Sequence, residues 1–327
     1  MKKWLLAFVQ CSLAFGLSFQ ASAQDASNYP NKPVRLIVPV PPGGAADAMA
    51  RLVAEHLQSK WGQPVTVDNK PGAGSAVGLG LLATSPKDGY TIGMGNIAAN
   101  AINPALQPTA FSYHPVKDFS AISLIGITPL VLVVNPDKVP ARNLQEFIAY
   151  LKANPDKLAY GSSGTGSSLH IAMELFLQKT GTKMLHVPYK GSAPMMTDLL
   201  GGQVVAAIDA ATTSWPQVKA GKLRALGIAG SEKAFFAPEL PLIKDSVAGF
   251  DVKPWHGLMA PAGTPPAIVN KISNEVQAYL KTPEAQTKLQ DKGVVKVGNS
   301  AAEFQAFMAS EFETYKKVIQ DAGIKPE

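Results

Sequence analysis

The sequence predicts an α/β protein made of two lobes. Short strand-like runs alternate with helix-like runs, glycine-rich junctions follow several of the strands, and about the last 65 residues have only helical patterns. Alternation of this kind implies mostly parallel strand pairing. We therefore expect two α/β lobes joined by two strand crossings, with the C-terminal helices packed back on the first lobe.

The first lobe begins with a buried strand at 34–40 (VRLIVPV), which the PPGG at 41–44 ends. The next run has the apolar period of an amphipathic helix, with one face formed by Ala46, Met49, Leu52, Val53 and Leu57. A second strand at 65–69 leads through a glycine-rich turn into a helix of small residues at 70–85. A third strand follows at 90–96.

The second lobe repeats this alternation, with helices at 144–155, 167–181 and 193–203 and strands at 158–163, 186–190, 204–210 and 223–230. A further strand-like run at 251–261 returns to the first lobe, and helical patterns at 266–281, 283–293 and 301–323 complete the chain. We therefore assign 1–23 to a signal peptide, 24–125 and 250–327 to lobe 1, and 126–249 to lobe 2.

The first residues have the pattern of a cleavable signal peptide. Lys2 and Lys3 precede an apolar run at 4–19, and the small residues at 21–23 (ASA) form a cleavage site. The apolar run is short for a membrane span. We expect cleavage between Ala23 and Gln24 and a soluble periplasmic protein.

Composition excludes several classes of function for the mature chain. Cys11 is the only cysteine, so removal of the leader excludes disulfides, thiol catalysis and cysteine metal sites. The remaining 28 basic and 24 acidic residues give a net charge of +4, and the basic residues are scattered, so nucleic-acid binding is not expected. The five histidines lack metal-ligand spacing. We expect no cofactor and no metal.

Four strand ends carry the same chemistry, because each places glycine, often with serine, between an apolar strand and a helix start. They lie at 39–47 (PVPPGGAAD), 69–75 (NKPGAGS), 160–168 (YGSSGTGSS) and 187–194 (VPYKGSAP). In open α/β sheets ligands bind beyond the carboxyl ends of strands, and helix N-termini suit anions. Four such junctions indicate a cleft lined by backbone amides.

Other interpretations of these loops meet specific obstacles. A phosphate-binding P-loop would need lysine where Ser167 stands, and a nucleophile elbow around Ser163 would need glycine at Thr165. The GMGNIA run at 93–98 lacks the long helix that dinucleotide binding requires. An exported serine hydrolase that uses Ser163 or Ser167 with His170 as its base remains an alternative.

Five stretches together resemble the substrate-binding proteins of tripartite tricarboxylate transporters, the TctC-like or Bug proteins; they lie at 33–57, 65–78, 88–96, 186–209 and 260–272. The resemblance covers essentially the whole mature chain. It implies a two-lobe periplasmic binding protein of type II that binds a dicarboxylate, an aromatic acid or an acidic amino acid. It also implies delivery to membrane permease subunits, with a sensor as the alternative partner, and we expect a monomer.

The resemblance implies a carboxylate cradle on the loops at 41–47 and 161–167, with Asp209 facing the ligand or its waters. The candidate ligand-binding residues are Val40, Pro41, Gly43, Gly44, Asp47, Ala73, Gly74, Asn96 and Ala98 in lobe 1, and Ser162, Ser163, Gly164, Thr165, Gly166, Ser167, Lys190 and Asp209 in lobe 2. Val40 stands where an aromatic residue is frequent, and Ile97 and Ala98 are apolar. These departures make room for a ring or chain and disfavour citrate.

Overall fold

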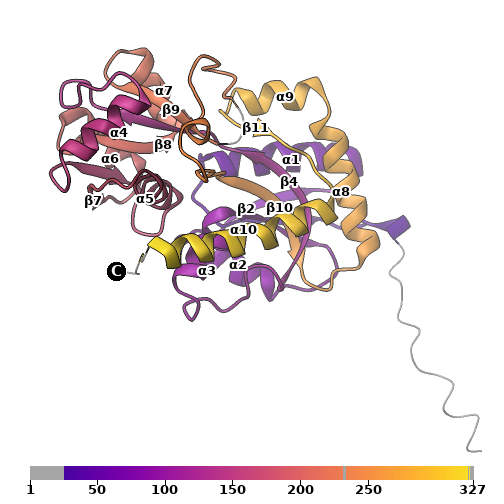
Figure 1. Cartoon of the computed structure of the whole chain (residues 1–327). Helices are drawn as coiled ribbons and strands as arrows, with labels where there is room; N and C mark the ends of the chain where they lie inside the picture. The colour runs from indigo at the N-terminus through magenta and orange to yellow at the C-terminus, as the bar shows by residue number, and fades with distance from the viewer. Residues whose placement is uncertain (1–25, 231–232, 323, 325–327) are drawn as a thin grey trace, which may run out of the picture.

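The computed structural model describes residues 26–230, 233–322 and 324. The predicted signal peptide and Cys11 therefore lie outside the described residues. Figure 1 shows two α/β lobes, with the chain passing between them twice. The first passage is short, because only Thr128 and Pro129 separate β4 (Phe119–Ile127) from β5 (Leu130–Val134), whereas the second runs from β9 (Arg224–Ala229) to β10 (Trp255–Pro261).

Lobe 1 is built on a six-stranded sheet in the order β11-β4-β10-β3-β1-β2. Its remaining strands are β1 (Val34–Val38), β2 (Val65–Asn69), β3 (Thr91–Asn96) and β11 (Val295–Lys296). Because β1 pairs in parallel with β2 and with β3, the carboxyl ends of these three strands share one edge of the sheet. The glycine-rich loops that follow them lie along that edge.

The helices of lobe 1 are α1 (Ala45–Trp61), α2 (Ala76–Ala83), a π-helical turn (Ala98–Ile102), α3 (Asn103–Leu106), α8 (Pro266–Leu280), α9 (Pro283–Gln290) and α10 (Ala301–Ala322). The predicted apolar face of α1 is confirmed, because Met49, Val53 and Leu57 are buried in one core with strand residues of β1. Gly62 ends this helix in the left-handed conformation, which glycine adopts without a Cβ penalty.

Lobe 2 is built on a five-stranded sheet in the order β7-β6-β8-β5-β9. Its elements are β6 (Ala159–Ser162), β7 (Leu185–Pro188), β8 (Ala206–Ala210), α4 (Leu144–Ala153), α5 (Ser168–Thr180), α6 (Ser192–Gly201) and α7 (Ala211–Lys219). β6 pairs in parallel with β7 and β8, so the predicted Gly/Ser loop at 161–167 and the start of α7 follow neighbouring strands.

The expectation of mostly parallel pairing is wrong for the strands that enter from the lobe boundary. β10 runs antiparallel to β3 and β4, and β5 runs antiparallel to β8 and β9. A strand that begins at the boundary must run away from it, whereas the strands that carry the loops end there.

Helix α10 packs on both lobes, although the sequence indicated lobe 1 alone. It lies against β4 and then reaches α5 of lobe 2 (Figure 1). Ile171 of α5 is buried in the same apolar cluster as Trp255 and Phe304, which belong to lobe 1. The C-terminal helix therefore bridges the boundary between the lobes on the side of Trp255.

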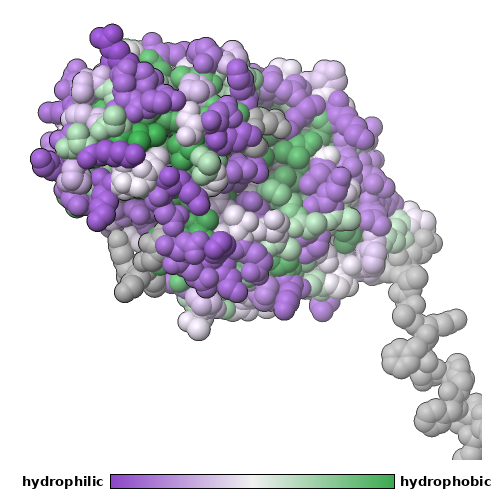
Figure 2. All heavy atoms as spheres, in the orientation of Figure 1, coloured by the Kyte–Doolittle hydropathy of each residue, from purple (hydrophilic) through white to green (hydrophobic). Residues whose placement is uncertain are grey.

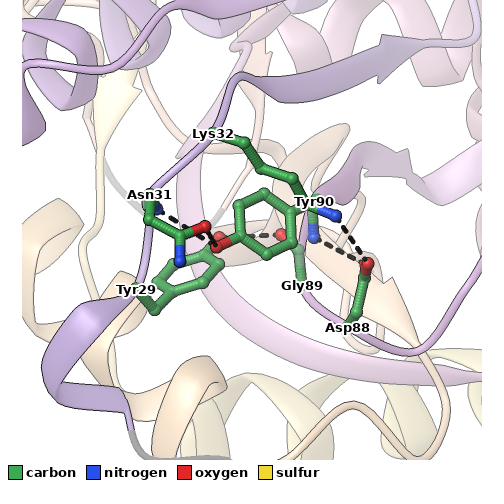
Figure 3. Close-up of polar contacts among 6 residues, drawn as sticks. All are labelled: Tyr29, Asn31, Lys32, Asp88, Gly89 and Tyr90. Carbon is green, nitrogen blue, oxygen red and sulfur yellow. Dashed lines mark hydrogen bonds and ion pairs between the residues drawn. The ribbon is translucent and has the colours of Figure 1, made fainter.

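A polar cluster holds the segment before β1 to the turn before β3. Figure 3 shows its members, which are Tyr29, Asn31, Lys32, Asp88, Gly89 and Tyr90. The Tyr29 hydroxyl donates to the Gly89 carbonyl oxygen at 2.7 Å, and the Tyr90 hydroxyl donates to Asn31 Oδ1 at 2.8 Å. Both contacts lie at the amino ends of parallel strands, away from the predicted site, so we assign this cluster a structural role.

Gly257 lies where β10 meets α10, and it leaves no room for a side chain. A Cβ atom there would lie 2.2 Å from Phe304 Cζ. We expect Gly257→Ala to lower the free energy of unfolding by about 1–3 kcal/mol, because overpacking a close-packed core forces neighbours out of position. Urea unfolding measures the change. Gly201→Ala is the control, since a Cβ there meets nothing within 4 Å; an equal loss in both variants would contradict the packing argument.

Candidate functional site

A cavity of about 660 Å³ is lined by residues of both lobes. Lobe 1 contributes the start of α1 at 43–45 and 48 and the turn after α9 at 290–293. Lobe 2 contributes several residues of α7 together with Phe235 and Phe236. A volume of this size is typical of a small-molecule site. Across it, the N-terminal end of α1 and that of α7 come from opposite lobes.

Asp47 fixes the loop that leads into α1. Its carboxylate is buried and accepts hydrogen bonds from the Gly43 N–H at 3.0 Å, from Arg51 Nε at 2.9 Å and from Asn69 Nδ2 at 2.9 Å. Although burial opposes ionisation, these hydrogen bonds keep the pKa of Asp47 below its usual value. Because both carboxylate oxygens are used, we infer that Asp47 positions the loop. The N-cap residue, Gly44, provides no side-chain cap.

Asp209 organises the start of α7 in a similar way. It is fully buried, its Oδ1 accepts from the Ser192 hydroxyl at 2.9 Å, and its Oδ2 accepts from the Thr213 hydroxyl. Burial raises the pKa of Asp209 despite these bonds. The carboxylate thus connects the starts of α6 and α7. Lys190, another candidate ligand-binding residue, is exposed on the surface.

The start of α7 also lacks a side-chain cap. Its N-cap residue, Ala210, makes no such bond, and the Ala211 N–H donates to the Pro129 carbonyl oxygen at 3.1 Å. Thr212 is exposed and lines the cavity. The first-turn amides of a helix have no intrahelical partner, so α1 and α7, whose N-cap residues form no side-chain cap among the described residues, both direct positive dipole ends and first-turn amides toward this cavity.

The Gly/Ser loop after β6 uses part of its polar groups internally. Ser162 is fully buried, and its Oγ lies 2.7 Å from His186 Nε2 and accepts from the Gly164 N–H at 3.2 Å. The His186 ring stacks on the His170 ring with centroids 4.0 Å apart. The two stacked rings therefore pack against the loop through Ser162 and Gly166.

The same loop ends in a helix cap. Ser167 Oγ accepts from the His170 backbone N–H at 3.2 Å, and His170 Nδ1 accepts from the Gly166 N–H at 3.1 Å. These bonds give Ser167 and His170 structural roles, so the pairing of Ser163 or Ser167 with a catalytic His170 base is not the arrangement found. In contrast to α1 and α7, helix α5 provides its own cap.

The loop lies directly against lobe 1 at Asn103. A Cβ atom on Gly166 would meet Asn103 Oδ1 at 2.9 Å, and Asn103 Nδ2 donates to the Gly74 carbonyl oxygen at 3.4 Å. Asn103 therefore links the loops at 72–75 and 161–167 across the lobe boundary. Thr165 Oγ1 is buried beside this contact without a hydrogen-bond partner among the described residues.

Asn96 holds the end of β3 rather than facing open solvent. It is buried, its Oδ1 accepts from the Ala99 N–H at 3.0 Å, and its Nδ2 donates to Ser75 Oγ at 3.1 Å. Ile97 is buried as well, so it does not widen the cleft, whereas Ala98 is half-buried.

The predicted residues therefore divide into three groups. Gly43 and Gly44 line the cavity, while Asp47, Asn96, Ser162, Ser167 and Asp209 position the loops. The third group lies in or near these loops without lining the cavity. Gly166 is buried, and the rest are exposed or half-buried; they are Val40, Pro41, Ala73, Gly74, Ala98, Ser163, Gly164, Thr165 and Lys190.

Sequence reasoning missed most of the lobe 2 wall of the cavity. That wall includes Thr212, Trp215, Lys219, Phe235 and Phe236. The available signal was the run ATTSW directly after the strand that contains Asp209, because it places hydroxyls and an aromatic ring at a helix start. Trp255, by contrast, is fully buried in the core.

Two α/β lobes joined by two passages of the chain, with a small-molecule cavity between helix N-termini, define a solute-binding protein of the periplasmic type. Residues 49–324 match the model of the tripartite tricarboxylate transporter family receptor, TctC, and the chain belongs to this family. It is a receptor and not an enzyme. Among the described residues we find no helix long and apolar enough to span a bilayer, and the face in Figure 2 is mostly hydrophilic.

Known relatives agree with this assignment. Protein BugT of Bordetella pertussis is 35% identical over 307 residues, which cover 93% of this chain and 94% of BugT. R. palustris Rpa4515, solved with adipate, matches with a TM-score of 0.80 and 34% identity, covering 92% of this chain and all of the other. MatC from Rhodopseudomonas palustris, solved with bound malate, matches with a TM-score of 0.75 and 29% identity over 89% of this chain and all of MatC.

Proposed function

We propose that this receptor binds a small organic carboxylate in the cavity between its lobes. The observation that carries the proposal is that two helix starts without side-chain caps, those of α1 and α7, line the same cavity from opposite lobes. A carboxylate between them would accept hydrogen bonds from amides of both lobes and meet two positive dipole ends. The adipate and malate in the structures of similar proteins support this class of ligand.

The charges around the cavity support an anionic ligand of modest affinity. Lys219 and Lys292 line it together with Asp291, and no arginine of the described part of the chain does. Recognition would therefore depend on backbone donors and dipoles rather than on a bidentate guanidinium. Closure of the lobes on the ligand would bury it and strengthen each of these hydrogen bonds.

Membership of the family supports a proposal for the rest of the pathway. The mature chain would begin near Gln24 after removal of the leader, act in the periplasm as a monomer, and deliver its carboxylate to membrane permease subunits. Docking on a sensor instead of a permease is the second candidate. A pull-down of membrane proteins with ligand-loaded and ligand-free receptor separates the two, because only one kind of partner should be captured in a ligand-dependent way.

A thermal-shift screen of organic acids tests the ligand class. A carboxylate at 100 times its Kd should stabilise the folded protein by about 2.7 kcal/mol, because it binds only the native state. Sugars and amines of similar size serve as controls and should leave the unfolding temperature unchanged. If sugars or amines raise that temperature while no acid does, the carboxylate assignment is wrong.

A further inference from the structure

One wall of the cavity between the lobes is aromatic. The Trp215 and Phe236 rings lie with centroids 5.2 Å apart and planes tilted by 54°, and Phe235 meets Phe236 edge-on at 5.3 Å. All three rings line the cavity. They form one continuous group, in the tilted and edge-to-face arrangements that aromatic side chains prefer.

Part of this aromatic wall is exposed to water. The described residues include five exposed large apolar side chains, and of these only Phe235, which is 41% exposed, lines this cavity. Trp215 and Phe236 are half-buried. Apolar area removed from water contributes roughly 25 cal/mol per Å², so a ligand that covers these rings gains affinity from them. Contiguous exposed apolar surface inside a cavity is typical of a binding surface.

The polar groups of the cavity lie beside this aromatic wall. Gly43, Gly44 and Thr212 surround the two helix starts, where the carboxylate is expected. Lys219 follows Trp215 by four residues, which places it on the same face of α7 one turn further along. The lining therefore offers donors and positive charge beside an apolar surface, which suits a ligand with a carboxylate and a bulky apolar body.

The size of the cavity agrees with a bulky ligand. Its volume of about 660 Å³ lies in the middle of the range of roughly 300–1,000 Å³ that holds drug-sized molecules. A short aliphatic acid would leave the three rings in contact with water. A ring system attached to the carboxylate would cover them.

We propose that the ligand is a ring-bearing carboxylate whose ring packs against Trp215, Phe235 and Phe236. The inference rests on the proposed function, since it places the carboxylate at the starts of α1 and α7. The three aromatic residues then determine which acid is preferred, whereas the helix starts recognise the charge that all acids share. Phe235 covers the outer part of the ring and becomes buried when the ligand binds.

Calorimetric titration of four acids tests this preference. The ring-bearing probes are cinnamate and 2-naphthoate, and the aliphatic probes are adipate and malate. We expect the ring acids to bind at least ~10-fold more tightly than the aliphatic ones, since tenfold corresponds to the gain from covering a modest apolar area. Phe235→Ala should weaken the ring acids by ~10-fold and adipate by less than ~3-fold.

Leu185→Ala is the matched control for Phe235→Ala, because Leu185 is an exposed apolar residue of the same lobe, 54% exposed, and does not line the cavity. It should leave every affinity unchanged. Trp215→Phe provides a second measurement that keeps a ring in place. Ring acids should quench tryptophan emission in the wild type, and this quenching should be lost in the variant.

The outcomes separate the inference from the function on which it rests. If adipate or malate binds as tightly as the ring acids and Phe235→Ala has no effect, the aromatic inference is wrong and the carboxylate receptor stands. If none of the four acids binds, the aromatic inference is wrong, and the thermal-shift screen of organic acids then decides the carboxylate function. Tighter binding of the ring acids that survives Phe235→Ala, or quenching that survives Trp215→Phe, would also overturn the inference, because another surface would then hold the ring.

Discussion

Replacing Gly166 by valine should weaken carboxylate binding at least ~100-fold, which corresponds to about 2.7 kcal/mol. Gly166 has a φ of +73°, a conformation that a β-branched residue tolerates poorly, and its Cβ would lie 2.9 Å from Asn103 Oδ1. The added side chain would push the loop at 161–167 away from lobe 1. The lobes could then no longer close in their present arrangement, and calorimetric titration would report the loss.

Gly181→Val is the control for this experiment. Gly181 has a φ of +62° at the end of α5, but a Cβ there meets nothing within 4 Å. It therefore reproduces the backbone strain without the contact to lobe 1, and it should bind its ligand as the wild type does. Wild-type affinity in Gly166→Val would show that the contact of this loop with lobe 1 is not needed for binding. An equal loss in both variants would attribute the effect to strain instead of the lobe contact.

Glu311→Gln should stabilise the protein at pH 8 by on the order of 2 kcal/mol and have little effect near pH 4.5. Burial raises the pKa of Glu311 from 4.5 to about 7, while Lys253 acts in the opposite direction and Asp251 adds to the rise. The folded protein thus binds more protons than the unfolded chain between these pH values. Stability must fall as the pH rises through that window, and glutamine, which resembles the neutral acid, removes the fall.

Urea unfolding at pH 5, 6, 7 and 8 measures this dependence. Glu313→Gln is the control, because the Glu313 side chain lies on the same helix but is 70% exposed. Its stability should differ little from that of the wild type at every pH. If Glu311→Gln changes stability by the same amount at pH 5 and pH 8, ionisation of Glu311 is not the cause.

The surroundings of Glu311 explain why its neutral form is favoured. Glu311 Oε2 is buried without a hydrogen-bond partner among the described residues, and the same holds for Trp255 Nε1, Tyr315 OH, His256 Nδ1 and Thr128 Oγ1. These residues belong to the two passages between the lobes and to the helix packed on them. Burial acts on His256 in the opposite direction and lowers its pKa to about 4, because the charged imidazolium is poorly solvated there. In both residues burial favours the neutral form.

The sequence by itself determined the two-lobed α/β architecture and the family. Strand and helix periods are properties of neighbouring residues, and so are glycine-rich turns. The strand predicted at 34–40, found at Val34–Val38, and the helix face of Met49, Val53 and Leu57 could therefore be predicted. The same local logic identified the loops at 41–44 and 161–167 as strand ends beside helix starts. Nothing beyond the order of residues was needed for these predictions.

Only the tertiary structure decided which helix starts face each other. The resemblance paired the loop before α1 with the loop before α5, and that pairing stays a prediction. In the structure Ser167 caps α5, and the cavity lies between the starts of α1 and α7. Asp209 does not line that cavity, whereas Trp215 and Phe235 do. In the sequence, aromatic residues such as these could equally have belonged to an ordinary core. The direction and burial of a side chain depend on residues distant in the chain, which packing brings together and local periodicity does not encode.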